Sequence, residues 1–247
     1  MSVHFACHGE SQPGGRSNNE DFMLWDERDG VLCAVVADGL GGHAGGAEAA
    51  KMACEAAIAS FLANPSVTPE AVHDHIRAAD DRIREEQRIR PALARMRSTL
   101  VMLVASATQA IWGHVGDSRL YHLSSGRIVS QTKDHSMPQH LVDLGEIEPA
   151  AIRNHEDRPR LLKALGEEEA VRFAVLTEPA VLKSGDAFLL CSDGFWENVL
   201  EIEMELDFAK SHSPLEWFNF MEGRLRERVG ASNDNYTAVA IQEAVRS

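Results

Sequence analysis

Cysteine is scarce in this chain of 247 residues, and its four copies lie far apart. Cys33 and Cys191 lie inside apolar runs, which is typical of buried free thiols. No two cysteines form a C-x-x-C pair. Long apolar stretches are also missing, and none approaches the length of a membrane span. The first ten residues, MSVHFACHGE, are too polar for a signal peptide, so we expect a cytoplasmic protein.

Basic residues are outnumbered, with 24 Lys and Arg against 38 Asp and Glu and a formal net charge of −14. This balance argues against nucleic acid, because affinity for phosphate backbones comes largely from Lys and Arg. It argues equally against an anionic membrane surface. A soluble, self-repelling surface explains most of the acidity. The functional alternative is that a subset of the carboxylates is balanced by bound cations.

Linkers rich in Pro, Gly or Ser, internal repeats and low-complexity tracts are absent as well. The length is sufficient for one large domain, and we expect a single domain over residues 1–247. Apolar patterns predict strands at 31–37, 99–105, 110–115, 119–123, 127–131, 171–181, 187–191 and 236–242. They predict helices at 44–62, 69–90, 137–144, 160–165, 201–210 and 214–229. This order favours an α+β fold of two mostly antiparallel sheets packed together, with helix pairs outside.

Acidic residues stand at the ends of the predicted strands. Four aspartates adjoin apolar runs, namely Asp38 in VVADGLGGH, Asp117 in WGHVGDSR, Asp193 in LLCSDGF and Asp234 in SNDNYTAVAI. The segment RSNNED adds two more carboxylates, Glu20 and Asp21. Two carboxylates about 4 Å apart repel by roughly 4 kcal/mol at an effective dielectric constant near 20. Such a cluster at one end of a sheet therefore predicts bound divalent cations.

The types of donor atom in this cluster indicate which cations it would bind. Oxygen-only ligands favour Mg²⁺ or Mn²⁺ over zinc. Gly39 has no side chain, so its carbonyl can approach a metal held by Asp38. Two ions would share a bridging water and lower its pKa, which supplies a hydroxide for attack on phosphorus. Arg16 is the candidate anchor for a phosphate, although a single Arg beside acids is usually a surface ion pair.

These segments together resemble the PPM-type (metal-dependent, type 2C) serine/threonine protein phosphatases in their bacterial single-domain form. The matching segments appear in the family's order and cover nearly the whole chain: RSNNED, VVADGLGGH, RSTLV, GDSR, DHS, RPRLLKALG, LLCSDGFWE and DNYTAVAI. Any one of them is weak, because Asp-Gly after a strand is usually a turn, but the ordered set is specific. No cysteine begins the C-x₅-R arrangement of thiol phosphatases, which agrees with the resemblance.

The resemblance implies a dinuclear Mg²⁺ or Mn²⁺ site with roles for five residues. It implies that Asp38 bridges the two ions. Asp193 and Asp234 would bind the first ion. Glu20, through water, and the carbonyl of Gly39 would bind the second.

Further roles follow from the same resemblance. Asp117, with Asp193, would hold a third ion of the kind seen in bacterial members. Arg16 would bind the substrate phosphate, and Asp21 would lie behind the metal ligands. Asn235 would fix the loop of Asp234, and we expect Thr99 and Ser192 to be structural.

The implied fold is a four-layer α-β-β-α sandwich with the metals at one end. The polar region at about 137–168 would be a flap beside the site, which we expect to be mobile and to influence the choice of phosphoprotein. Two positions depart from the family pattern. Leu40 occupies the place where some members carry a histidine that protonates the leaving group, and Arg97 replaces a frequent glycine. His43 lies three residues farther on, where packing near a helix start is the simpler interpretation.

The expected activity is hydrolysis of phosphoserine and phosphothreonine in proteins by metal-activated water, without a covalent phosphoenzyme. The expected partners are phosphorylated proteins and a cognate bacterial serine/threonine kinase, and the expected state is a monomer. The compact chain also resembles phosphatases that oppose kinases controlling type VI secretion. Two alternatives remain open. One is a catalytically weak adaptor that binds phosphoprotein, although all ligand positions are intact. The other is a hydrolase of small phosphomonoesters, which rates on a phosphopeptide and on a small ester would distinguish.

Overall fold

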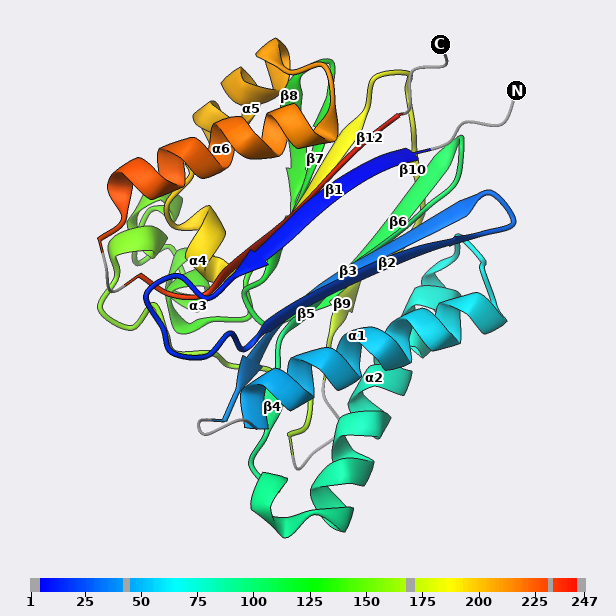
Figure 1. The fold of residues 1–247 in the computed structure, drawn as a ribbon, viewed down its shortest axis with the longest axis vertical. Coiled ribbons are helices and arrows are strands. Elements are labelled where there is room, and N and C mark those ends of the chain that lie inside the picture. The colour runs from blue at the N-terminus through cyan, green and yellow to red at the C-terminus, as the bar shows by residue number, and fades with distance from the viewer. Residues whose placement is uncertain (1–4, 42–44, 168–171, 231–232, 244–247) are drawn as a thin grey trace.

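The computed structural model describes residues 5–41, 45–167, 172–230 and 233–243. Two β-sheets face each other, and a pair of helices covers the outer face of each (Figure 1). Helices α1 (Gly45–Ala63) and α2 (Pro69–Ile89) cover one sheet. Helices α5 (Glu201–Lys210) and α6 (Pro214–Arg228) cover the other. The predicted four-layer α-β-β-α sandwich is confirmed.

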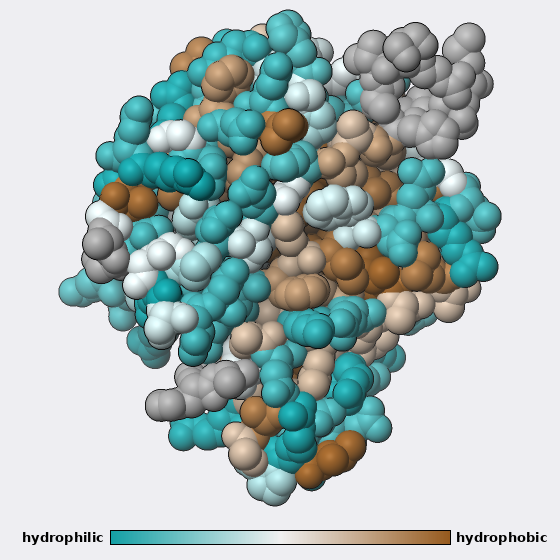
Figure 2. All heavy atoms as spheres, viewed as in Figure 1, coloured by the Kyte–Doolittle hydropathy of each residue, from teal (hydrophilic) through white to brown (hydrophobic). Residues whose placement is uncertain are grey.

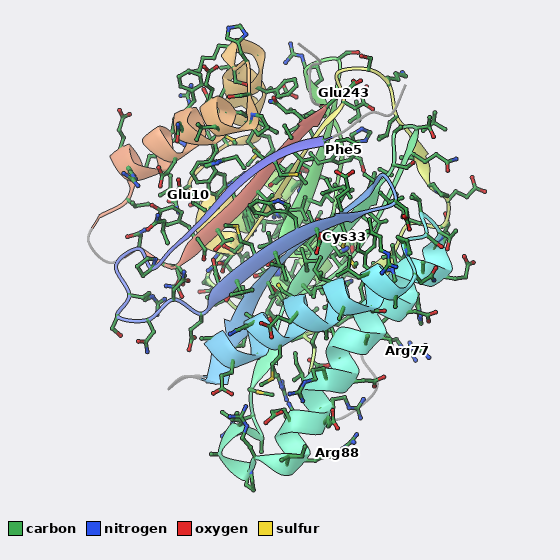
Figure 3. All side chains as sticks on the ribbon, turned by 45° about the vertical axis from the view of Figure 1, so that its right-hand side comes forward. Phe5, Glu10, Cys33, Arg77, Arg88 and Glu243 are labelled. Atoms are coloured by element: carbon green, nitrogen blue, oxygen red, sulfur yellow. The ribbon has the colours of Figure 1, made fainter. Side chains whose placement is uncertain are left out.

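The smaller sheet has five strands and contains both ends of the described chain. Its order is β1 (Phe5–Gln12), β12 (Tyr236–Glu243), β11 (Ala187–Cys191), β7 (Arg119–Ser124) and β8 (Arg127–Gln131). Phe5 pairs with Glu243 and Gln12 with Tyr236 (Figure 3). This register brings the segment after β1, which contains Arg16, beside the segment before β12, which contains Asp234.

The larger sheet has the strand order β10 (Ala180–Val181), β6 (Gln109–Val115), β5 (Leu100–Ala105), β3 (Val31–Leu40) and β2 (Asp21–Arg28). Two short strands complete it, with β4 (Arg97–Ser98) on β3 and β9 (Ala174–Val175) on β6. Every strand pair in the described residues is antiparallel, as predicted.

Strand β3 is apolar from Val31 to Ala37, and both faces of this part are buried. Side chains alternate across a strand. Val35, with Cys33, packs toward the helix layer, while Val36, with Ala34, packs toward the opposite sheet. Figure 3 shows Cys33 on the ribbon of β3, above the helices. Figure 2 shows apolar side chains along the seam between β1 and β2, where the two sheets meet.

The helices follow local sequence signals. Small buried residues on α1, such as Ala49, Ala53 and Ala57, let its backbone lie close to the sheet. Thr68 caps α2 by accepting a hydrogen bond from the Ala71 amide at 3.2 Å. Pro69 occupies the first turn, where a missing N–H is tolerated. The charged second half of α2 is only partly solvated, because Asp80 and Glu86 are buried. No candidate membrane span is found among the described helices.

Some element predictions were wrong. Residues 160–165 form no helix and instead make isolated bridges, Ser136 with Leu161 and Ser98 with Leu165. The predicted strand at 171–181 is only two short pieces, β9 and β10, and its first residue lies outside the described chain. Strands β1 and β2 and the short helix α4 (Asp193–Trp196) were not predicted. The region between β8 and β9 contains helix α3 (Met137–Asp143) and the 3₁₀ helix η2 (Pro149–Asn154).

Candidate metal centre

One end of the sandwich gathers all of the predicted site residues. Antiparallel pairing places the end of β3 beside the start of β2, and the ends of β1, β6 and β11 at the same edge. A pocket of about 220 Å³ opens there. Its lining includes the predicted phosphate anchor, Arg16, and Asn235, which was expected to fix the Asp234 loop. It also includes all six predicted metal ligands: Glu20, Asp38, Gly39, Asp117, Asp193 and Asp234. Asp21 pairs with Asp38 across β2 and β3, directly behind this lining.

Asp38 is anchored through its backbone. Its N–H donates to Thr99 Oγ1 at 2.9 Å, and its carbonyl accepts from the Thr99 amide at 2.8 Å. Thr99 Oγ1 also lies 2.7 Å from Ser118 Oγ, in the turn that carries Asp117. Thr99 therefore joins the loops of two acidic residues, which agrees with its expected structural role.

Gly39 occupies a place with no room for a side chain. A Cβ atom there would lie 1.9 Å from the carbonyl oxygen of Gly46, at the start of α1. A Cβ atom on Gly46 would in turn lie 2.8 Å from the carboxyl carbon of Glu20. The Gly39 amide donates to the Glu20 carbonyl at 3.0 Å. These contacts bring Glu20 against the end of β3, and only glycine permits them.

Asn235 joins the two ends of the chain at the site. Its Oδ1 accepts from the Glu20 amide at 2.8 Å, and its Nδ2 donates to the carbonyls of Pro13 and Asn18 at 2.9 Å. Its own amide donates to Asp234 Oδ1 at 2.8 Å. Asn235 thus orders the RSNNED segment as well as the Asp234 loop.

Two further carboxylates lie at the ends of neighbouring elements. Asp193 begins α4, and its Oδ1 accepts from the Gly194 amide at 2.6 Å. Asp21 Oδ2 accepts from Ser192 Oγ at 2.6 Å, while its buried Oδ1 has no hydrogen-bond partner among the described atoms. Ser192 also exchanges hydrogen bonds with Thr237, which agrees with its expected structural role.

Burial at this end of the sandwich raises the pKa of three carboxyl groups, those of Asp21, Asp38 and Asp117. Burial is the largest cause for Asp38, followed by repulsion from neighbouring aspartates, and both push its pKa well above the usual range. Burial and then Asp193 do the same to Asp117. Burial raises the pKa of Asp21 to about 7 despite its hydrogen bond from Ser192. A divalent cation would reverse this penalty by stabilising the charged forms.

Arginines engage two of the carboxylates. Arg16 Nη2 lies 2.8 Å from Asp234 Oδ2, and Arg158 Nη1 lies 3.0 Å from Asp193 Oδ2. Within the described residues, no three His, Cys, Asp or Glu side chains form a preformed cation cage. The oxygen-only donor set and the unpartnered oxygen of Asp21 nevertheless fit Mg²⁺ or Mn²⁺.

No role was predicted for Arg158 or Glu197. Both lie within quoted motifs, RPRLLKALG and LLCSDGFWE, yet no spacing indicates that Arg158 bridges Asp193 and Glu197. Among the histidines, His135 accepts from the Gly116 amide at 3.3 Å and stacks on His114, as a structural residue would. His43 lies outside the described residues. Leu40 lines the pocket, paired across β4 with the exposed Arg97.

Known proteins resemble this chain in sequence and in fold. The family model of protein phosphatase 2C matches residues 8–232. The serine/threonine phosphatase stp of Listeria welshimeri is 32% identical over 206 residues, 81% of each chain. The catalytic domain of the phosphatase PstP, solved with two manganese ions, is 27% identical with a TM-score of 0.81 and covers 99% of this chain and 100% of its own.

A third relative, PppA, is described as a key regulatory component of T6SS in Pseudomonas aeruginosa. Its structure is 30% identical with a TM-score of 0.79, covering 99% of this chain and 100% of its own. The residues of the pocket, the order of the motifs and these relatives agree. The chain belongs to the protein phosphatase 2C family and is a manganese- or magnesium-dependent protein serine/threonine phosphatase.

Proposed function

We propose that the acidic pocket at the end of the sandwich is the active site and that residues 1–247 form one catalytic domain. The observation that carries this proposal is the convergence of Glu20, Asp38, Asp117, Asp193 and Asp234 in one pocket with Arg16. The raised pKa values of Asp38 and Asp117 support it, because a cluster that opposes its own ionisation is suited to cations.

The donor set suggests how the ions would be held. Asp38 would bridge two of them, with Asp193 and Asp234 on the first. Glu20 and the Gly39 carbonyl would hold the second, and Asp117 with Asp193 a third. When bound, such ions supply Lewis acidity and an activated water for attack on phosphorus.

The chain's own residues would bind and orient the substrate. Arg16 would hold the phosphate through its planar fork of N–H donors. Its side chain is 59% exposed and, among the described residues, forms an ion pair with Asp234 alone, so it can change partner when a phosphate arrives. Asn235 would keep Glu20 and Asp234 in register during this exchange, since it bonds to both segments.

The substrates would be proteins phosphorylated by a serine/threonine kinase, whose action this monomeric enzyme would reverse. The likeness to PppA supports a place in the control of a secretion system, as that relative's description suggests. The exposed position of Arg16 supports a protein substrate, because a phosphate on a protein surface can reach it.

The test compares kcat/KM on a phosphothreonine peptide and on p-nitrophenyl phosphate, with Mn²⁺ present. We expect Arg16→Gln to lower both values, because both substrates carry the phosphate. We expect a higher value for the peptide in the unmodified protein, since only the peptide can use contacts outside the pocket. A higher value for the small ester would overturn the assignment to phosphoproteins.

A further inference from the structure

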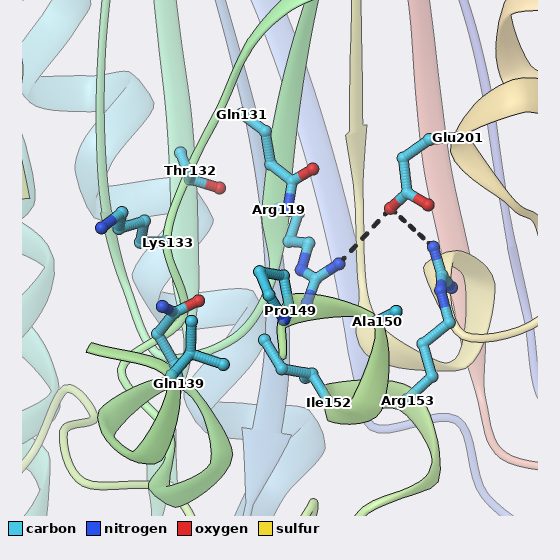
Figure 4. A pocket seen from close by; sticks show the side chains of 11 residues that line it. Arg119, Gln131, Thr132, Lys133, Gln139, Pro149, Ala150, Ile152, Arg153 and Glu201 are labelled. Carbon is cyan, nitrogen blue, oxygen red and sulfur yellow. Dashed lines mark hydrogen bonds and ion pairs between the residues drawn. The ribbon is translucent and has the colours of Figure 1, made fainter. Parts of the chain in front are cut away.

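A second cavity, of about 440 Å³, lies between β7, α5 and the flap, and its basic side chains are already paired. The ion pairs are Arg119 with Asp134, Arg153 with Glu201 and Lys133 with Asp143. Figure 4 shows Glu201 joined by dashed lines to both Arg119 and Arg153. These cations are neutralised within the protein, so an anionic partner would need positive charge elsewhere.

Two arginines beside the acidic pocket differ from these. Arg95 and Arg97 are exposed, and neither forms an ion pair or a side-chain hydrogen bond with another described residue. The net charge of the chain is −14. Two neighbouring cations without counter-charges among the described residues therefore make a local region of positive potential on an acidic protein.

Backbone pairing places both arginines beside the lining of the acidic pocket. Arg97, on β4, lies opposite Leu40, on β3, and opposite residues of an antiparallel pair project from the same face. Leu40 and Gly41 both line the pocket. A Cβ atom on Gly41 would lie 3.4 Å from the carbonyl oxygen of Arg95. The two arginines therefore border the pocket on the side of β4, and we call this pair the basic rim.

The backbone of the basic rim is fixed on three sides. Met96 is 1% exposed, and its carbonyl accepts from Gln87 Nε2 at 2.7 Å. Ser98 Oγ donates to the Asp38 carbonyl at 3.0 Å, and the Ser98 amide donates to the Leu165 carbonyl at 3.3 Å. The rim is thus attached to α2, to β3 and to the end of the flap. A partner would order only the two arginine side chains, which limits the entropic cost of binding.

The distance from the rim to the proposed active site suits a peptide. Asp38 lies two residues before Leu40 on β3, about 7 Å along an extended strand. An extended peptide covers the same distance in about two residues. Side chains two or three residues from a phosphorylated residue bound at the pocket can therefore reach the rim.

We propose that the basic rim binds glutamate or aspartate side chains of the substrate, two or three residues from the phosphorylated residue. This inference rests on the proposed function, because it assigns a sequence preference to the same site. The planar guanidinium groups of Arg95 and Arg97 match a carboxylate with two parallel N–H donors. Lysine or arginine at these substrate positions would be repelled by the rim.

The test compares two phosphothreonine peptides with Mn²⁺ present. One carries Glu at the second and third positions on both sides of the phosphothreonine, and the other carries Gln there, which has the same shape without the charge. The readout is the ratio of the two kcat/KM values, so that general effects on activity cancel. At low ionic strength we expect a ratio of at least about threefold in favour of the Glu peptide, since one exposed ion pair contributes up to about fivefold. Salt at about 1 M should bring the ratio near one, because the Debye length falls to about 3 Å.

Variants establish that the preference comes from the rim. The double variant Arg95→Gln/Arg97→Gln should lower the ratio to about one or less, whereas Arg97→Lys should keep most of it because the charge remains. Arg77→Gln is the matched control and should keep the full ratio. Arg77 is exposed, has no ion pair among the described residues, and lies about 18 Å along α2 from Ile89, the end nearest the rim (Figure 3).

The outcomes separate this inference from the proposed function. A ratio near one in the unmodified protein, an unchanged ratio in the double variant, or an equal fall in Arg77→Gln would overturn the role of the rim and leave the phosphatase activity in place. If the double variant fails to fold, the single variants Arg95→Gln and Arg97→Gln decide, and each should lower the ratio. Failure to hydrolyse either peptide would overturn the proposed function and this inference with it.

Discussion

Two arginine–carboxylate pairs show how burial decides what a residue can do. Arg119 and Asp134 are 4% and 2% exposed and are joined by two hydrogen bonds, so neither can exchange its partner. Arg16 and Asp234 are 59% and 39% exposed and joined by one. Exposed pairs contribute little to stability. Arg16 can therefore leave Asp234 for a phosphate, whereas Arg119 has a structural role.

Replacing Arg16 by Gln should lower kcat/KM by about 10- to 100-fold, since hydrogen bonds to charged groups contribute about 1.5–3 kcal/mol. The free energy of unfolding should change by less than about 1 kcal/mol, because the pair is exposed. Steady-state kinetics on a phosphothreonine peptide and urea unfolding measure the two quantities. Arg127→Gln, which removes an ion pair that lies outside the acidic pocket and whose arginine is 71% exposed, should leave kcat/KM unchanged. Unaltered kcat/KM in Arg16→Gln would exclude the phosphate role.

Replacing Asp134 by Asn should instead destabilise the fold by about 3–5 kcal/mol, because it leaves the buried Arg119 without its counter-charge. Urea unfolding in EDTA measures this loss without a contribution from metal. Asp143→Asn is the control, since Asp143 is half exposed and pairs with the exposed Lys133. A loss below about 1 kcal/mol would contradict this, and would show that Glu201 and the hydrogen bond to Tyr121 suffice to stabilise the charge of Arg119.

At the scale of elements, the sequence predicted the helices and strands that have a local sequence pattern. Strand β3 was predicted because both of its faces are apolar, and α2 because Thr68 and Pro69 mark its start. Strand β1 was missed because its polar residues are only half-buried and its pairing partner, β12, lies more than 220 residues away. The helix expected at 160–165 failed because single bridges to Ser98 and Ser136 hold that segment extended.

The flap should be the most mobile part of the described chain around the site. Its ends are held by the bridges of Ser136 to Leu161 and Ser98 to Leu165, while its centre, near residues 144–157, has exposed side chains. Amide hydrogen exchange should therefore be faster at 144–157 than in β3 or β11. Mass spectrometry of peptic peptides measures the rates. Protection equal to that of the core strands would contradict this prediction.

At the scale of the whole molecule, the fold explains why the residues of the site could be predicted from the sequence. It also explains why the hydrogen bonds and ion pairs among them could not. The acidic residues each adjoin a strand end, and antiparallel pairing brings those ends to one edge. Strand signals and motif order were therefore sufficient to predict them. The contact of Arg158 with Asp193 depends on the path of the irregular flap, which no local pattern specifies. The same holds for the bonds of Asn235 to Pro13 and Asn18.

Stability of the metal-free protein should depend on pH through the acidic cluster. The folded pKa of Asp21 is about 7, mainly because of burial, whereas an unfolded Asp titrates near about 3.9. The folded state thus holds the proton more tightly, and this group's contribution to stability falls as pH rises from about 4 to about 7. In EDTA, Asp21→Asn should flatten the decline of Tm over this range relative to the unmodified protein. An identical pH profile in the variant would contradict the raised pKa.

Millimolar Mn²⁺ should raise the Tm of the protein at pH 7, because a ligand that binds only the folded state stabilises it by mass action. The free energy of unfolding should rise by about 2.7 kcal/mol when Mn²⁺ exceeds its dissociation constant 100-fold. Differential scanning calorimetry with Mn²⁺ and with EDTA measures it. No rise would count against the acidic pocket as a metal site.

The most direct test of the account is phosphate release from a phosphothreonine peptide, measured with Mn²⁺ and with EDTA for the unmodified protein and for Asp38→Asn. Asp26→Asn, an exposed aspartate of β2, serves as the control. Activity should require Mn²⁺, persist in Asp26→Asn and fall by at least about 100-fold in Asp38→Asn, since one carboxylate would bridge both ions. Equal activity in EDTA, or near-normal activity in a folded Asp38→Asn, would contradict a metal-dependent centre built on Asp38.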